Sequence, residues 1–134
     1  ELLCSATFPA FPSGTGTTFV EVARRKGDYA LCGVAAAVGV DPDGLVTSVR
    51  TAYISVDPTP LVLDLTDAVG GTSAATADWA AAGALARSQV SPEPDIHATA
   101  SYRAHLVGVL TARALVEAAA AAGGSAADAP SVVR

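Results

Sequence analysis

The first half of the chain carries short runs of apolar and β-branched residues separated by turn residues, a pattern that predicts β-strands. Strands are expected at residues 2–8, 17–22, 31–40 and 45–56. The string Asp41-Pro-Asp-Gly between the last two runs has proline and glycine at positions that favour a tight turn. The sequence therefore predicts a small antiparallel sheet of three to four strands.

The second half changes to an apolar spacing of three and four residues, which is typical of helices. A short helix is expected at 67–70, a second at 76–89, and a long third helix at 100–122, where Gly123 and Gly124 should end it. The candidate N-cap residues are Ser73 or Thr76 for the second helix and Thr99 or Ser101 for the third.

Strands followed by helices indicate an α+β fold, with a small antiparallel sheet followed by about three helices packed on one face. The run 31–40 is apolar at both alternating sets of positions, so the other face of the sheet should also be covered. With so few helices, that cover is expected from a part of the protein outside this chain. The chain begins within a predicted strand, which indicates a fragment or excised domain, and residues 123–134 predict a flexible tail.

Composition and charge exclude several classes of function. The 134 residues carry a formal net charge of −5, which disfavours nucleic acid as a partner because phosphate binding requires a basic excess. No window approaches the ~18 uncharged apolar residues of a membrane span, so no span is expected. The start of the chain lacks the positive charge of a signal peptide, so we expect a cytoplasmic protein.

The two cysteines, Cys4 and Cys32, are not arranged for a metal site. They form no Cys-x-x-Cys motif, and neither His97 nor His105 lies near them in the sequence. No metal is therefore expected. Because both cysteines fall in apolar, strand-like runs, we expect two reduced thiols in the core, with a disulfide between neighbouring strands as the alternative.

The strongest candidate for chemistry is a charged cluster directly before the apolar run 31–40. Three of the eight Lys and Arg residues lie here. One interpretation is a solvated turn between two strands, because Gly-Asp is common in turns. The other is a loop that presents charge to an anionic ligand, with glycine permitting close backbone approach. We name this segment the basic turn; it comprises Arg24, Arg25, Lys26, Gly27, Asp28 and Tyr29.

The remaining candidates have ordinary structural interpretations. Asp95 and His97 could form a proton relay, but their position before a helix favours a capping arrangement. His105 is expected on the half-exposed side of the long helix, and Trp79 in the core or an interface. The string Gly14-Thr-Gly lacks the helix start of a phosphate loop. No Ser-His-Asp or Cys-His set is recognisable, so no catalytic residue is assigned.

Three strings, in matching order and spacing over about residues 1–120, resemble one known family. They are Phe19-Val-Glu-Val-Ala-Arg-Arg-Lys-Gly-Asp-Tyr-Ala, Asp57-Pro-Thr-Pro and Asp95-Ile-His-Ala-Thr-Ala-Ser-Tyr-Arg. Together they are similar to the C-terminal domain of the FAD-binding (medium) subunit of carbon monoxide dehydrogenase and other xanthine dehydrogenase-family molybdenum hydroxylases. The chain departs from the family pattern at Cys32, where valine is usual, at His97, where arginine is common, and at Ser101, where glutamate is common.

The resemblance implies that residues 1–122 form such a domain, and that the basic turn lies near the FAD ring, where its cations would stabilise the anionic reduced ring. FAD itself would be bound mostly by N-terminal FAD-binding domains outside this chain. The implied partners are those domains and the molybdenum and iron–sulfur subunits. Electrons would pass from iron–sulfur clusters through FAD to an acceptor, and this domain would not be catalytic alone. The alternatives are a non-enzymatic protein-interaction module and a small-anion binder.

Overall fold

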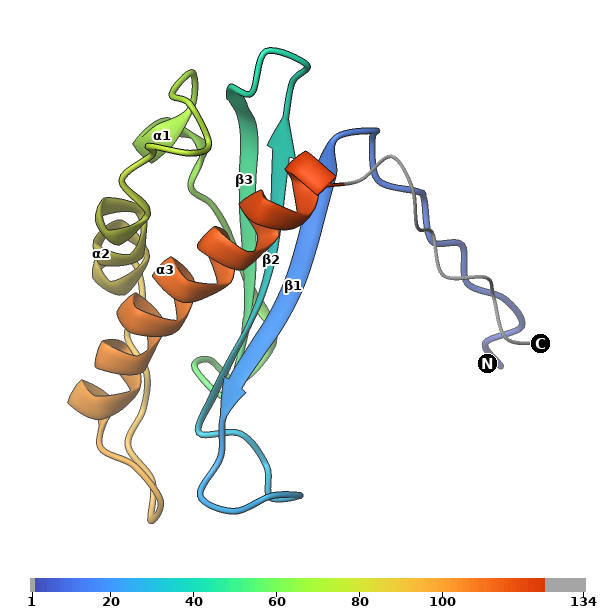
Figure 1. The fold of residues 1–134 in the computed structure, drawn as a ribbon. Helices are drawn as coiled ribbons and strands as arrows, with labels where there is room; N and C mark the ends of the chain where they lie inside the picture. The colour runs from blue at the N-terminus through green and yellow to red at the C-terminus, as the bar shows by residue number, and fades with distance from the viewer. Residues whose placement is uncertain (1, 125–134) are drawn as a thin grey trace.

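A four-stranded antiparallel sheet forms the first half of the fold. The computed structural model of the chain describes residues 2–124, and its sheet consists of β1 (Thr15–Val22), β2 (Cys32–Val40), β3 (Val46–Ile54) and β4 (Leu61–Asp64). The strands lie side by side in sequence order, each antiparallel to the next (Figure 1). The predicted small antiparallel sheet is therefore confirmed.

Three helices follow, α1 (Thr66–Val69), α2 (Trp79–Ser88) and α3 (Ala100–Gly124). α3 crosses β1 and β2, and α2 packs against α3 on the same side of the sheet (Figure 1). This arrangement confirms the predicted α+β fold. The predicted tail, 123–134, lies outside the described residues except for Gly123 and Gly124, which are the last two residues of α3 as the structure describes it.

The core lies between α3 and the side of the sheet that faces it. Val34, Val38, Val49 and Tyr53 point to this side and are fully buried. The Tyr53 hydroxyl forms a hydrogen bond with the Thr111 hydroxyl of α3, with an Oη–Oγ1 distance of 2.9 Å, so neither polar group is left unpaired inside the core. Burial raises the pKa of Tyr53, which keeps the phenol protonated.

Small residues let α3 approach its neighbours closely. A Cβ atom at Gly16 of β1 would collide with the backbone of Ala118 and Ala122. A Cβ atom at Gly83 of α2 would collide with the carbonyl oxygen of Gly108. Alanine and glycine bury little area each, so these interfaces are stabilised by dense packing of backbone against backbone.

α3 is long and apolar enough to resemble a membrane span, since 24 of its residues, Ala100–Gly123, meet the length and composition of one. Half of its most apolar window is buried within the fold, where α3 packs on the sheet and on α2. This is the environment of the core helix of a folded domain. Arg103, Arg113 and Glu117 interrupt α3, so it contains no stretch of ~18 uncharged apolar residues, as expected from the sequence.

The strand predicted at residues 2–8 is wrong. This segment has no regular structure, and it has no paired strand within the described residues. Strand propensity alone does not satisfy the backbone N–H and C=O groups of an isolated extended segment. Conversely, the sequence pattern misses β4, a strand of four residues that follows two prolines and therefore gives a weak signal.

The helix caps are confirmed for one helix and wrong for another. Oγ1 of Thr99 accepts a hydrogen bond from Tyr102 N–H at 3.2 Å and caps α3, as predicted. α2 begins at Trp79, later than predicted, and is capped by Asp78, whose Oδ1 accepts from Ala81 N–H at 2.9 Å. The predicted caps of this helix, Ser73 and Thr76, lie too far before its first turn.

The two cysteines are free thiols in different environments. Cys32 is fully buried in β2, as predicted, and burial raises its pKa to about 11. Cys4 is exposed, so the prediction of two core thiols is wrong for this residue, because its segment lies off the core. Trp79 is buried, which confirms the core interpretation, and His105 is exposed on α3.

Candidate functional site

The basic turn lies at one end of the sheet, beside an open cleft of about 780 Å³. Residues from three connecting segments line the cleft: 24–31 between β1 and β2, 55–58 after β3, and 91–97 before α3. Arg103 of α3 completes the lining. Segments far apart in the sequence thus meet where β1 and β3 end and α3 begins (Figure 1).

The backbone of the basic turn is held by two hydrogen bonds. Leu31 N–H donates to the Val22 carbonyl at 2.7 Å and closes the loop, and Asp28 N–H donates to the Arg25 carbonyl at 3.1 Å within it. Gly27 has a φ of 90°, in the left-handed region that favours glycine. No other group lies within 4 Å of a Cβ atom built at Gly27, so backbone conformation and not crowding requires glycine here.

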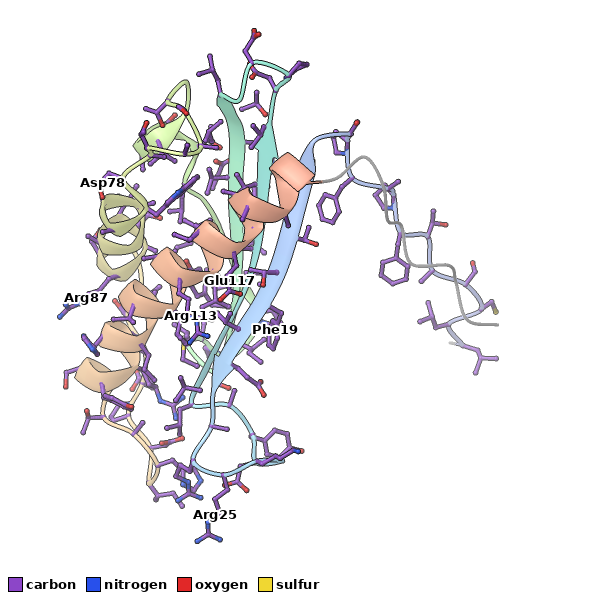
Figure 2. The ribbon with its side chains drawn as sticks, in the orientation of Figure 1. Phe19, Arg25, Asp78, Arg87, Arg113 and Glu117 are labelled. Carbon is purple, nitrogen blue, oxygen red and sulfur yellow. The ribbon has the colours of Figure 1, made fainter. Side chains whose placement is uncertain are left out.

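The six side chains of the basic turn do not all face the cleft. Arg25 and Lys26 lie outside its lining, and Arg25 projects away from the body of the protein (Figure 2). The predicted positive charge is therefore divided between the cleft and the outer tip of the turn. The four members that do line the cleft are Arg24, Gly27, Asp28 and Tyr29.

The lining members of the turn are themselves loosely held. Arg24 and Asp28 form an exposed ion pair with an Nη2–Oδ2 distance of 4.0 Å, which contributes little to stability. Tyr29 is 99% exposed, so its ring packs against almost nothing within the described residues. An aromatic ring this exposed is available for contact with another molecule.

Arg103 holds the cleft together, and the sequence pattern does not identify it as a site residue. It is only 6% exposed, and its Nη1 donates to the carbonyl oxygens of Leu31 at 2.8 Å and Ser55 at 2.6 Å. Its Nη2 donates to Asp95 Oδ2 at 2.5 Å. One side chain thus ties together all three segments of the cleft. The third family string contains both Asp95 and Arg103, and this pair was the available sequence signal for the site. Their spacing does not show that the chain folds back to bring Arg103 against Leu31 and Ser55.

Ser55 marks the point where the chain leaves β3 for the cleft. Its φ of 62° makes it the one non-glycine residue with a left-handed backbone among those described. The carbonyl of Ser55 is one of the two that accept from Arg103. This bond stabilises a backbone conformation that costs about 1–3 kcal/mol in a non-glycine residue.

Asp95 organises the segment before α3. Its Oδ1 accepts hydrogen bonds from the N–H groups of His97 at 2.8 Å and Ala98 at 2.9 Å, while Oδ2 faces Arg103. The His97 N–H, the Ala98 N–H and the Arg103 guanidinium together lower the pKa of Asp95 to about 2. Asp95 therefore organises the loop before α3 and does not cap the helix itself, which is capped by Thr99, and His97 contributes its backbone to this loop.

The cleft carries more negative than positive groups. Four carboxylates line it, against the two guanidinium groups of Arg24 and Arg103. This surplus does not fit the pyrophosphate of FAD, and no glycine-rich phosphate loop lies in the lining. The part of the site that does fit a flavin is the outer tip of the basic turn, with its two cations and the neighbouring aromatic ring. The four carboxylates are those of Asp28, Asp57, Glu93 and Asp95.

Metal-ligating side chains do not gather in the part of the chain that the structure describes. No group of three or more His, Cys, Asp or Glu side chains within residues 2–124 is placed to hold a metal ion.

Comparison with known sequences supports the resemblance seen in the three strings. The family model of the CO dehydrogenase flavoprotein C-terminal domain matches residues 17–118. The 6-hydroxypseudooxynicotine dehydrogenase complex subunit alpha of Paenarthrobacter nicotinovorans is 30% identical over 119 residues, which are 88% of this chain and 40% of that protein. The nicotine 6-hydroxylase medium subunit of the same organism is 34% identical over 121 residues, which are 90% of this chain and 42% of that protein. The chain thus spans about 40% of the length of these relatives.

Solved structures share the same fold. Carbon monoxide dehydrogenase from Hydrogenophaga pseudoflava matches with a TM-score of 0.74 at 30% identity, over 84% of this chain and 39% of that chain. Quinoline 2-oxidoreductase from Pseudomonas putida 86 matches with a TM-score of 0.68 at 31% identity, over 81% of this chain and 38% of that chain. Sequence and fold agree, and the chain belongs to the family of CO dehydrogenase flavoprotein C-terminal domains.

Proposed function

We propose that this chain is the C-terminal domain of a flavoprotein subunit of a molybdenum hydroxylase, an FAD-dependent oxidoreductase. In this assembly electrons pass from iron–sulfur clusters through FAD to an acceptor. The observation that carries the proposal is the family match over residues 17–118, and relatives named as subunits of a hydroxylase and a dehydrogenase complex support it. The domain supplies docking surfaces and electrostatics, and it is not catalytic alone.

The basic turn is the part of the domain that we assign to the flavin. FAD, when bound by the assembly, accepts electrons and passes them on. Arg25 and Lys26 bring two positive charges to the outer tip, and Tyr29 presents a ring that is 99% exposed. Such side chains contact an electron-rich aromatic group through charge and through stacking. The bond from Arg103 to the Leu31 carbonyl holds the end of the turn in place.

Positive charge beside the flavin makes its reduction more favourable, because reduction adds negative charge to the ring. Two unit charges 4 Å apart interact by about 4 kcal/mol at an effective dielectric constant of about 20, and solvent around an exposed turn reduces this several-fold. For a two-electron couple, about 30 mV corresponds to about 1.4 kcal/mol. The basic turn should therefore raise the reduction potential by roughly tens of millivolts.

The double variant Arg25→Ala/Lys26→Ala in the complete flavoprotein subunit tests this assignment. The reduction potential of the flavin should fall by about 30 mV, with the flavin content unchanged. The matched control is Arg87→Ala, which removes an exposed cation from α2, far from the basic turn (Figure 2). Equal potentials in the double variant, the control and the parent would contradict the assignment of the turn. A purified subunit without flavin would contradict the proposed function itself.

We also propose the partners of this domain and its compartment. The partners are the N-terminal FAD-binding domains and the iron–sulfur and molybdenum subunits, and the expected compartment is the cytoplasm. A complete gene without a flavin-binding domain would instead favour the non-enzymatic protein-interaction module.

A further inference from the structure

The sheet has a second face, opposite the helices, that no element of residues 2–124 covers (Figure 1). The register aligns Phe19, Ala35, Ala52 and Val62 as consecutive neighbours across the four strands of this face. Phe19 is 53% exposed and Val62 is 63% exposed, so two alanines form a floor between two large apolar side chains. We name this surface the open face; it comprises Phe19, Gly33, Ala35, Ala52, Ile54 and Val62.

The side chains of Phe19 and Ile54 meet over Gly33. Ile54 and Gly33 belong to the next row of paired residues, so the apolar surface extends beyond the first row. A Cβ atom at Gly33 would lie 2.7 Å from Ile54 Cγ1 and 3.1 Å from Phe19 Cζ. These two side chains bury Gly33, yet Ile54 itself remains 39% exposed. The cluster is only partly covered by its own residues, and contiguous apolar surface of this kind marks interaction sites.

Charged side chains border this cluster and do not interrupt it. Arg50 and Asp64 form an ion pair on the next row, with an Nε–Oδ2 distance of 3.7 Å, and Glu21 lies opposite Gly33 on the edge strand β1. An apolar centre with a polar border is the arrangement of a protein–protein interface. The floor of alanine and glycine permits a partner backbone to approach closely.

The segment before β1 continues the apolar surface. Residues 11–13 line a hollow of about 380 Å³ together with residues of β2 and β3, among them Ala37 and Arg50 on the side of the open face. From there the segment extends away from the helices (Figure 1). Its large apolar side chains are mostly exposed; they are Leu2, Leu3, Phe8 and Phe11.

We propose that the open face is the surface on which the flavin-binding part of the subunit docks, an inference that rests on the proposed function. This chain covers 40% and 42% of the two relatives, and the family model that matches it is a C-terminal domain, so most of their additional residues precede it. Residues 11–13, which lead into β1, line the hollow beside the open face. A domain connected through this segment has a high local concentration there.

One docking event accounts for both the open face and the basic turn. β1 and β2 run along the open face, with residues 11–13 near one end and the basic turn connecting the strands at the other. A domain that covers the face along these strands reaches the basic turn, where Arg25, Lys26 and Tyr29 would meet its bound flavin.

Cysteine accessibility in the complete flavoprotein subunit tests the proposal. Val62→Cys places a thiol on the open face, and Ala84→Cys places one on the exposed side of α2; both variants also carry Cys4→Ser to remove the exposed native thiol. In the folded subunit, the thiol of Val62→Cys should react with a maleimide about tenfold more slowly than that of Ala84→Cys. After unfolding in guanidinium, the two thiols should react equally fast.

Equal rates in the folded subunit would overturn the proposal. Protection that is lost on dilution, together with a change in sedimentation from dimer to monomer, would overturn it in favour of a second copy on the face. The thiol test of the docking surface and the flavin test of the proposed function can fail independently of each other. If the thiol of Val62→Cys reacts freely while the flavin potential still responds to Arg25→Ala/Lys26→Ala, the docking surface is wrong and the proposed function stands. If the purified subunit contains no flavin, the proposed function is wrong.

Discussion

Arg103 and Asp95 lie eight residues apart and form an ion pair with an Nη2–Oδ2 distance of 2.5 Å. The pair joins the first turns of α3 to the segment that precedes it, and Arg103 also donates to the carbonyls of Leu31 and Ser55. A planar guanidinium with several donors can bond these groups at once. The walls of the cleft therefore depend on one side chain of the core helix.

Replacement of Arg103 should destabilise the protein. Arg103→Ala removes the donor from two carbonyl oxygens, and Arg103→Lys cannot reach all the acceptors with one ammonium group. We expect the free energy of unfolding to fall by about 3 kcal/mol for Arg103→Ala and about 2 kcal/mol for Arg103→Lys, measured by urea unfolding. The control Arg113→Ala removes an exposed arginine of the same helix and should cost less than about 0.5 kcal/mol. An equal loss in the control would contradict the role of Arg103.

Asp95 should make stability depend on acidic pH. Its pKa is about 2 in the folded protein against an ordinary value of 3.8, so the folded state favours the carboxylate. The stabilisation is fully present above pH ~4 and is lost as the pH falls toward ~2. The difference in unfolding free energy between the parent and Asp95→Asn should be constant from about pH 7 to pH 5 and should shrink from about pH 4 to pH 2. A difference that is the same at every pH would contradict the lowered pKa.

Gly83 and Gly108 lie together where α2 packs on α3, but they should respond differently to alanine. A Cβ atom at Gly83 would collide with the Gly108 carbonyl, whereas one at Gly108 would lie 3.6 Å from both the Gly83 carbonyl oxygen and Arg87 Cβ. Gly83→Ala should destabilise by about 2 kcal/mol in spite of its better helix propensity. Gly108→Ala should be neutral or stabilise by up to about 1 kcal/mol. Thermal unfolding measures both, and equal midpoints would argue against the close approach of these helices.

The two thiols should differ in reactivity. Cys32 is fully buried with a pKa of about 11, so it carries almost no thiolate at pH ~8, whereas Cys4 is exposed. With a chromogenic disulfide reagent, one thiol of the chain should react quickly and the second only after unfolding. Cys4→Ser should remove the fast reaction, and Cys32→Ser should leave it unchanged. Fast reaction of Cys32 in the native protein would contradict its burial.

Much of the fold could be predicted from the sequence because it follows local patterns. The turn between β2 and β3 is closed by Gly44 N–H donating to the Asp41 carbonyl at 3.0 Å, as the Pro-Asp-Gly string predicts. α3 follows from its apolar spacing over 25 residues. The segment 2–8 has strand propensity but no neighbouring strand within the described residues, and a propensity cannot supply one.

The candidate site could be predicted only in part, because its residues meet through tertiary structure. The basic turn is a local pattern, and four of its six residues do line the cleft. The outward direction of Arg25 depends on the path of the turn about Gly27, which composition does not reveal. The role of Arg103 depends on the chain before α3 folding back against Leu31 and Ser55, which are 72 and 48 residues away.

The exposure of the basic turn has a consequence for how such a domain can diversify. Arg25 projects away from the body of the protein and Tyr29 is 99% exposed, so these side chains give little support to the rest of the molecule. The end of the turn at Leu31, in contrast, is held in place because Arg103 of α3 donates a hydrogen bond to the Leu31 carbonyl. Exposed side chains of the basic turn can therefore be exchanged without disturbing the fold, whereas a replacement of Arg103 would alter all three segments of the cleft together.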